Sequence, residues 1–301
     1  MERVLWPMEP VEPRMASFFT RLFSQIGRYI DGMAWLESVF KKHDPKQKAM
    51  DEYNLGLAAK YRGEWEESLA RNRRAAELNS EGEASWWNLG IAATALRDWS
   101  EARRAWLACG VTLLEGDGEP EIAECWGCVR LNPDSSGEVV WGKRIDPARI
   151  RVMNVPLPEA DRRYGDIILN DGAEEGTRTS RGRDYPVFNE LALWKRSNYS
   201  TYEVQVGTVS GEARESLRRL CEGADMAFED WGTVRILCAQ CSLGNPGEHQ
   251  CADLDDAVRP SRFGFAARGR SVLDELLGKW AEVEPALELG PVVLAVSGSN
   301  A

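Results

Sequence analysis

Histidine is almost missing from this sequence, and so are long hydrophobic runs. Only His43 and His249 occur among 301 residues, so a nucleophile–histidine–acid triad has very little to draw on. The glycine patterns that cradle nucleotide phosphates, G-x-x-x-x-G-K-[ST] and G-x-G-x-x-G, do not occur either. No stretch approaches the roughly 18 consecutive apolar residues of a membrane span. These absences disfavour a triad hydrolase, a nucleotide-binding enzyme and an integral membrane protein.

Positive charge is also in deficit. The net charge is −11, with 48 acidic side chains against 37 basic ones. Nucleic acids and anionic membranes bind basic surfaces, so we expect neither as a partner. The acidic balance suits a basic protein partner, or simply solubility. The first seven residues do not show the basic region and apolar run of an export signal, and we therefore expect a cytoplasmic location.

The cysteines suggest a metal site. Their number is seven, which is odd, and four of them form C-x-x-C pairs, so reduced thiols or metal ligands are favoured over a disulfide framework. Cys238 and Cys241 follow a predicted strand, and a Gly/Pro-rich turn leads to His249 and Cys251. Three thiolates and one imidazole complete the tetrahedral shell of a structural zinc ion within 238–251. The alternative is a pair of small buried thiols at a strand end, with His249 in an exposed loop.

A second C-x-x-C pair, Cys125 and Cys128, has three possible roles. It could be a redox pair, it could join Cys238 and Cys241 in a four-cysteine site, or its thiols could be structural. No clear helix follows it, whereas thioredoxin-like motifs lie in a β–α context. The structural role is therefore favoured.

Two copies of one pattern lie end to end in the first half of the chain, over 49–82 and 83–114. The step from Gly56 to Gly90 is 34 residues, and so is the step from Trp65 to Trp99. This period resembles the tetratricopeptide repeat (TPR), a helix–turn–helix unit. The pattern places small residues where two helices approach (Gly56 and Ser68; Gly90 and Ala102) and large ones between them (Leu55, Trp65, Leu89, Trp99, Trp106). The first copy departs from the family at Glu52, where Trp is favoured, and at Asn72, where an aromatic is favoured.

The TPR resemblance implies a protein-binding scaffold. We expect an amphipathic helix over 15–42 to pack against the first repeat, and a further helix could begin at 111–114. Trp86 and Trp87 are adjacent and point to different sides of a helix, so one is expected in the core and the other as a surface anchor for a partner. The turn-rich run 116–120 places a domain boundary near 118.

The second domain, 119–301, carries alternating strand-like runs and two amphipathic helices. They are listed as strands 138–143, 150–155, 166–169, 202–209, 234–237 and 291–296, and helices 212–222 and 271–284. The fold class is therefore α+β: N-terminal all-α TPR-like hairpins followed by an α/β domain with a mostly antiparallel sheet. The run 169–183 is polar and is predicted to be a long loop. Four carboxylates in or near it, Asp166, Asp171, Glu174 and Glu175, are candidates for partner binding, with a solvated loop or acid–base work as the alternatives.

The combined architecture is similar to a group of bacterial TPR proteins, and in part to immunity proteins that neutralise secreted polymorphic toxins. The residues that carry this likeness are 129–133, 155–159, 165–166, 186–188 and the cysteine-rich turn. The resemblance implies a non-catalytic protein that binds one partner, a toxin, and blocks it stoichiometrically. An adaptor or chaperone that binds peptide segments is the second hypothesis, and an enzyme in the C-terminal domain is the third.

The zinc hypothesis predicts one zinc ion per chain, because the four ligands 238, 241, 249 and 251 form a single closed shell. Elemental analysis of protein purified without chelator measures this ratio. A well-folded sample that contains no zinc would end the hypothesis.

Overall fold

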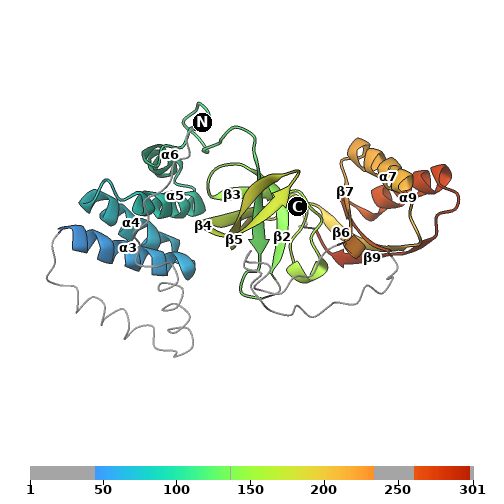
Figure 1. Cartoon of the computed structure of the whole chain (residues 1–301), viewed down its shortest axis with the longest axis horizontal. Coiled ribbons are helices and arrows are strands. Elements are labelled where there is room, and N and C mark those ends of the chain that lie inside the picture. Colours follow the sequence, from blue (N-terminus) through green and yellow to red (C-terminus); the bar gives the residue numbers. More distant parts are fainter. Residues whose placement is uncertain (1–44, 136, 234–260, 299–301) are drawn as a thin grey trace. The chain divides into compact units, whose positions relative to one another are not determined.

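A computed structural model describes residues 45–135, 137–233 and 261–298 of the chain (Figure 1). The chain divides into two compact units, 1–119 and 120–301. The described part of the first unit is helical, and the second is built on mostly antiparallel strands, so the predicted α+β class is confirmed. Within the described residues, no helix combines the length and apolar character that crossing a membrane requires.

The helical unit consists of two successive helix pairs joined by short connections. Its helices are α3 (Pro45–Tyr61), α4 (Trp65–Leu78), α5 (Glu83–Leu96) and α6 (Trp99–Ala108). Each helix packs against the next one along the chain. The helices α4 and α6 begin at the two tryptophans that are 34 residues apart, so the sequence period sets where these helices start. Residues 111–114 form no helix.

The first helix pair is held together by a polar contact across a glycine. The Ser68 Oγ donates to the carbonyl of Gly56 at 2.9 Å, and the Asn72 amide donates to the Ser68 carbonyl at 2.8 Å. A Cβ atom at Gly56 would lie 2.4 Å from Asn72 Nδ2, so only glycine fits there. Asn72 is fully buried. The amide therefore occupies the space beside Gly56, which accounts for the departure from the aromatic that the TPR pattern favours.

The second helix pair packs a glycine against a tryptophan ring. Trp106 is fully buried, and a Cβ atom at Gly90 would lie 2.6 to 2.8 Å from its ring carbons. Trp87 meets the same ring edge-on, with centroids 5.3 Å apart. Large and small residues thus interlock across α5 and α6, as the sequence pattern predicts.

The second unit begins with a closed five-stranded barrel. Its strands are β1 (Trp126–Leu131), β2 (Glu138–Arg144), β3 (Arg149–Val152), β4 (Ile167–Ser180) and β5 (Arg183–Lys195). Successive strands are antiparallel, and β1 closes the barrel by pairing with β5 in parallel. Because side chains alternate along a strand, one set fills the interior. That set includes Val129, Leu131, Val140, Ile150, Val152 and Ile168, with Ala160 from the short η1 helix (Pro158–Ala160).

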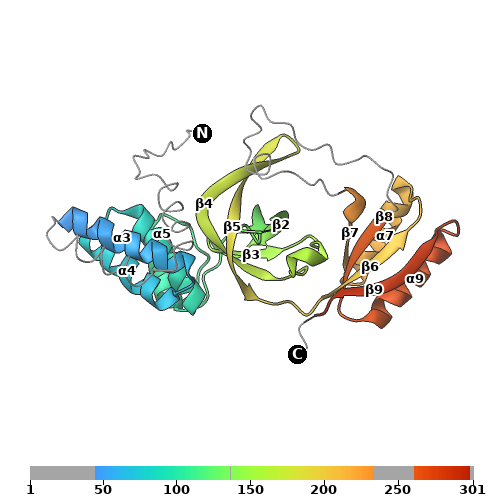
Figure 2. The ribbon, with the colours of Figure 1, turned by 90° about the horizontal axis from the view of Figure 1, so that it is seen from below.

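A four-stranded sheet with two helices follows the barrel (Figure 2). Its strands β6 (Ser200–Val206), β7 (Ala227–Asp230), β8 (Ser261–Ala267) and β9 (Leu289–Val296) lie in the order β7-β8-β6-β9, and neighbours are antiparallel. The helices α7 (Gly211–Gly223) and α9 (Arg270–Val283) pack on the sheet through a common apolar core. The largest buried side chains of that core are Trp280, Phe263, Phe265 and Leu217. The outer strand β9 includes Pro291 and exposes Val293 and Leu294.

One prediction about the second unit is wrong. The run 169–183 is not a loop, because β4 continues to Ser180 and forms a long hairpin with β5. The hairpin turns at Arg181 and Gly182, which both have positive φ, 50° and 73°. Turns of this kind match the twist of paired strands. The polar composition of β4 obscured the strand, since its outer half has little apolar surface to bury.

The contact between Gly90 and Trp106 generates a stability prediction. Gly90→Ala should destabilise the helical unit by about 1–3 kcal/mol, because the new methyl group overlaps a buried ring that has no room to move. Chemical unfolding followed by circular dichroism measures the change. Gly278→Ala is the matched control, since a Cβ atom there meets nothing within 4 Å and the residue lies inside α9; it should leave stability unchanged or raise it slightly. Equal stability of Gly90→Ala and the parent protein would contradict the packing.

Candidate functional site

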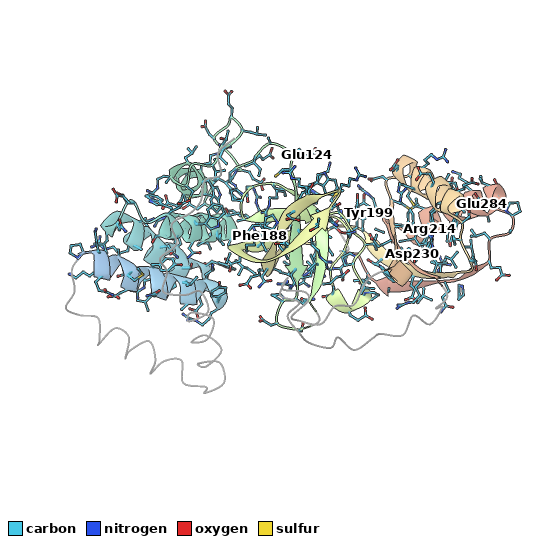
Figure 3. The ribbon with its side chains drawn as sticks, viewed as in Figure 1. Glu124, Phe188, Tyr199, Arg214, Asp230 and Glu284 are labelled. Carbon is cyan, nitrogen blue, oxygen red and sulfur yellow. The ribbon has the colours of Figure 1, made fainter. Side chains whose placement is uncertain are left out.

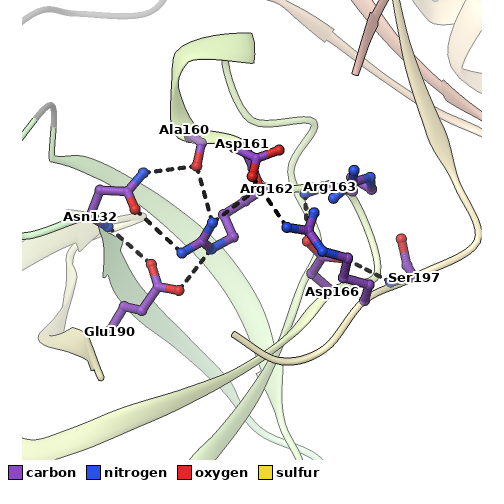
Figure 4. Close-up of polar contacts among 9 residues, drawn as sticks. Asn132, Ala160, Asp161, Arg162, Arg163, Asp166, Glu190 and Ser197 are labelled. Atoms are coloured by element: carbon purple, nitrogen blue, oxygen red, sulfur yellow. Dashed lines mark hydrogen bonds and ion pairs between the residues drawn. The ribbon is translucent and has the colours of Figure 1, made fainter. Parts of the chain in front are cut away.

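Asp166 organises the junction between the barrel and the following sheet. Its two carboxylate oxygens accept from the backbone amides of Arg163, at 2.9 Å, and Ser197, at 2.7 Å (Figure 4). Asp166 is completely buried, and burial raises the pKa of its carboxyl group while the two amides oppose that shift. The carboxylate, predicted to meet a partner, is instead occupied inside the protein. It fixes the segment 196–199 that links β5 to β6.

A pocket of about 190 Å³ lies at this junction. Arg151 on β3 pairs with Ile167 on β4, and Ile167 pairs with Lys195 on β5. Residues directly opposite on neighbouring strands share one face, so these three side chains lie together. Their neighbours Ile150 and Ile168 fill the barrel interior, which places Arg151, Ile167 and Lys195 on its outer surface.

The other walls of the pocket come from the linker and the second sheet. They include Arg196, Tyr199 and Arg268. The Tyr199 hydroxyl donates to Asp225 at 2.9 Å, and the Arg268 guanidinium lies 5.2 Å from the Tyr199 ring centroid. Arg268 also pairs with Asp225 at 2.8 Å. The pocket therefore has a fixed aromatic wall and four cationic side chains, which suit it to an anion.

A second polar cluster surrounds Arg162, on the other side of the same connecting segment (Figure 4). Its guanidinium donates to Glu190 Oε1 at 2.7 Å and to Asn132 Oδ1 at 3.4 Å. Glu190 Oε2 also accepts a hydrogen bond from the backbone N–H of Asn132 at 3.0 Å. A pocket of about 250 Å³ adjoins this cluster. Since its charged groups satisfy one another, we assign the cluster a structural role in holding β1, β5 and the segment 160–162 together.

The remaining predicted carboxylates lie along β4, at different depths. Asp171 is buried, and its Oδ1 accepts from the backbone amide of Gly172 at 2.7 Å. Glu174 is exposed and accepts from Thr177 Oγ1 at 3.2 Å. Glu175 is half-buried, and its carbonyl accepts from the Arg130 guanidinium at 2.9 Å. Glu174 is thus the one of these three that presents its carboxylate fully to solvent.

The adjacent tryptophans Trp86 and Trp87, the candidates for partner binding, are both half-buried on α5. Trp86 donates from its indole nitrogen to the Ser80 carbonyl at 2.9 Å, and the Arg104 guanidinium lies 4.7 Å from its ring. Trp87 packs on Trp106. Trp87 therefore belongs to the core side of the helix, and Trp86 is the candidate anchor of the pair.

Of the two C-x-x-C pairs, the structure describes only Cys125 and Cys128. The proposed zinc ligands Cys238, Cys241, His249 and Cys251 lie outside the described residues. Cys125 precedes β1 and is exposed, whereas Cys128 is buried in that strand, where burial raises its pKa to about 11. Among residues 45–135, 137–233 and 261–298, no three histidine, cysteine or acidic side chains gather as a metal site.

Two half-buried carboxylates lie near each other at the start of β2 and in β7: Glu138, which no sequence pattern marks, and Glu229, which stands beside Asp230 in an acidic pair visible in the sequence. Glu138 Oε2 accepts from the Leu157 amide at 3.0 Å, and burial, assisted by the nearby charge of Glu229, raises its pKa to about 7. Burial also raises the pKa of Glu229, which accepts from the Asn154 amide at 2.8 Å. Their sequence positions carry no sign of this proximity, because the strands that bring them together are far apart in the chain.

The second sheet carries one more ion pair. Arg214 on α7 binds Asp230 on β7 at 2.9 Å (Figure 3). Asp230 is the less exposed partner, with 9% of its side chain accessible against 38% for Arg214. The pair ties the helix to the edge of the sheet, so we assign it to stability.

Comparison with known proteins adds little to the geometry. No family model and no curated protein matches the chain. One solved structure, a hypothetical protein from Neisseria gonorrhoeae, aligns over 60% of this chain and 99% of its own, with 13% sequence identity and a TM-score of 0.26. A TM-score this low supports no conclusion about fold or function.

The raised pKa of Glu138 leads to a pH prediction. A carboxyl group with pKa about 7 when folded, and about 4.5 when unfolded, binds more protons in the folded state, so its stabilising contribution is lost as the pH rises from about 4.5 through 7. Glu138→Gln should match the parent protein near pH 5 and exceed its stability by about 1–3 kcal/mol at pH 8. Denaturant unfolding at both pH values measures this difference.

The control for this experiment is Glu282→Gln on the exposed side of α9. It should shift stability equally little at pH 5 and pH 8. If Glu138→Gln follows the same flat profile as the control, the buried carboxyl group does not titrate as described.

Proposed function

We propose that the chain is a non-catalytic protein-binding protein, and that it acts as a bacterial immunity protein that neutralises a toxin by direct stoichiometric binding. The observation that carries this proposal is the outer half of the β4–β5 hairpin, residues 174–186, which we call the arm. The arm is built for recognition because most of its side chains are exposed on a hydrogen-bonded frame. A preformed element loses little conformational freedom when it binds.

The arm extends past the rest of the barrel sheet. The strands β4 and β5 have 14 and 13 residues, against four to seven in β1, β2 and β3. Between Thr177 and Pro186 the two strands of the arm pair with each other, in continuous register across the turn. Its base is fastened by Tyr185, whose ring meets Trp141 edge-on at 4.9 Å. Hairpins and loops held by a rigid scaffold are common binding elements.

The charge of the arm is mixed, not acidic. Three acidic residues (Glu174, Glu175, Asp184) and three arginines (Arg178, Arg181, Arg183) lie within 174–186. Complementary charges at an interface contribute to specificity and association rate. The arm therefore fits a partner surface with both signs of charge, and the acidic balance of the whole chain favours a partner that is basic overall.

The helical unit carries further candidate contact residues. Met50, Tyr61 and Leu107 are large apolar side chains with 44%, 43% and 61% of their surface exposed. Trp86 adds a half-buried indole. Aromatic and apolar anchors of this kind dominate the binding energy of protein interfaces. These side chains also support the second hypothesis, an adaptor or chaperone that holds peptide segments on the helices.

The arm can be tested by reversing its charge. In the variant Glu174→Arg, Asp184→Arg, two acidic side chains of the arm become basic, and we expect affinity for a basic partner to fall on the order of tenfold. The control Glu222→Arg, Glu282→Arg changes the net charge equally at exposed positions of α7 and α9. Affinity capture from the native host with each protein, followed by mass spectrometry, identifies the partner. Titration of the purified partner measures affinity and stoichiometry.

Three outcomes separate the hypotheses. An immunity protein recovers one partner at a ratio of 1:1, loses it in the arm variant and rescues cells that express that partner. Capture of many peptides that is lost in Trp86→Ala but kept in the arm variant favours the adaptor. A captured partner whose toxicity is unchanged by this chain rules out the immunity role.

A further inference from the structure

We propose that the junction pocket lined by Arg151, Lys195, Arg196 and Arg268 binds the phosphate group of a small ligand. This inference goes beyond the proposed function and does not rest on it. The first observation is that the charge of the pocket lining is opposite in sign to the net charge of the chain. The chain as a whole is acidic, with a net charge of −11, yet the charged residues that line this pocket are all basic.

The positive charge is only partly neutralised by neighbours. Arg196 pairs with Asp161 at 3.2 Å, and Arg268 pairs with Asp225 at 2.8 Å. Both pairs are exposed, and exposed pairs are weak and open readily to a better ligand. Four cations against these two carboxylates leave an excess of two positive charges around the pocket, and the buried Asp166 beneath it is already bonded to two amides.

The fold fixes the backbone positions from which the cations extend. Arg151 and Lys195 lie on neighbouring sides of Ile167 across three paired strands. The linker that carries Arg196 is fastened by the Asp166–Ser197 bond and by a 2.6 Å bond from the Ser197 hydroxyl to the Tyr164 carbonyl. Because the backbone is already ordered, anion binding would restrict only the side chains.

The close packing of the turn before the linker supports this frame. Gly165 has a φ of 82°, and a Cβ atom there would lie 3.3 Å from the Ser197 side chain and 3.5 Å from the Tyr199 ring. The glycine lets the turn approach the linker closely. The turn backbone and the Tyr199 ring therefore form part of the pocket lining, with the Arg268 guanidinium beside the ring.

The size and the donors of the pocket select the ligand. Pockets for drug-sized molecules measure roughly 300–1,000 Å³, whereas this one measures about 190 Å³, so it suits a single small group. Three guanidinium groups and one ammonium group line the pocket, and they come from β3, β5, the linker after β5 and the turn between β8 and α9. A phosphate group has oxygens in several directions that can accept from all of them, whereas a carboxylate presents two oxygens in one plane.

The proposal is tested on the purified full chain, without any partner. Inorganic phosphate and pyrophosphate are titrated at constant ionic strength, with sodium chloride as the reference salt and acetate as the carboxylate probe. Isothermal titration calorimetry and phosphorus NMR report binding directly. We expect phosphate or pyrophosphate to bind one site per chain, more tightly than acetate.

Two variants then locate the site. Arg151→Ala and Lys195→Ala each remove one exposed cation and should weaken binding roughly tenfold. Arg219→Ala and Lys279→Ala remove equal charge from the exposed faces of α7 and α9 and should leave the affinity unchanged. All four positions are exposed, so the variants are expected to fold.

Several results would overturn the proposal: no binding of either phosphate probe, acetate binding as tight as phosphate, or equal weakening in the pocket variants and the controls. Each of these is independent of the toxin-binding experiment, because the arm variant leaves the pocket residues intact. Failure of the phosphate site thus leaves the proposed immunity role standing, and the reverse also holds.

Discussion

The hydrogen bonds that Asp166 makes to two backbone amides hold the second unit in its arrangement. One amide belongs to Arg163, just after the short helix η1, and the other to Ser197, in the link between barrel and sheet. A fully buried carboxylate is costly unless its oxygens are bonded. Since both oxygens are satisfied by backbone, the bonds fix the course of the chain on both sides of β4 and β5. The linker that lines the pocket and leads into β6 is fastened by this contact.

Other tertiary contacts reinforce the same junction. The indole nitrogen of Trp231 donates to the Val155 carbonyl at 2.9 Å, and Arg163 donates to the Ser297 carbonyl at 2.7 Å. Val155, Tyr199, Trp231 and Ala266 form a small apolar cluster between the two sheets. Polar bonds therefore set the geometry, and apolar burial stabilises it. A ligand or partner that contacts the linker would act on a well-determined surface.

The sequence predicted those elements whose side chains repeat with a clear period. The 34-residue step predicted two helical hairpins over 49–82 and 83–114, and alternation or helical periodicity placed β2, β6, α7 and α9 within a few residues. Glycine 90 was assigned correctly to a close helix contact, because only its Cβ-free backbone can meet a large ring. Such patterns can be recognised in the sequence because the secondary structure of each residue there depends mainly on neighbours a few positions away.

The candidate site was far less visible in the sequence. The sequence predicts Asp166 as a surface group that meets a partner, and no local pattern marks the basic residues around the pocket. Arg151, Lys195 and Arg268 are separated by 44 and 73 residues in sequence and are brought together by strand register and by the junction. The charged β4–β5 hairpin was read as a loop because its outer half buries little apolar surface. Long-range pairing of this kind has no local signature.

The outer strand of the second sheet has a consequence for behaviour at high concentration. Among the described strands β9 lies at the edge of its sheet, and an edge strand that exposes apolar side chains such as Val293 and Leu294 is a template for pairing with a strand of another molecule. Pro291 lies in this same strand and has no amide hydrogen to offer a newcomer. The missing N–H leaves a gap in the row of donors along this strand, so the proline disfavours pairing of the sheet with a second copy.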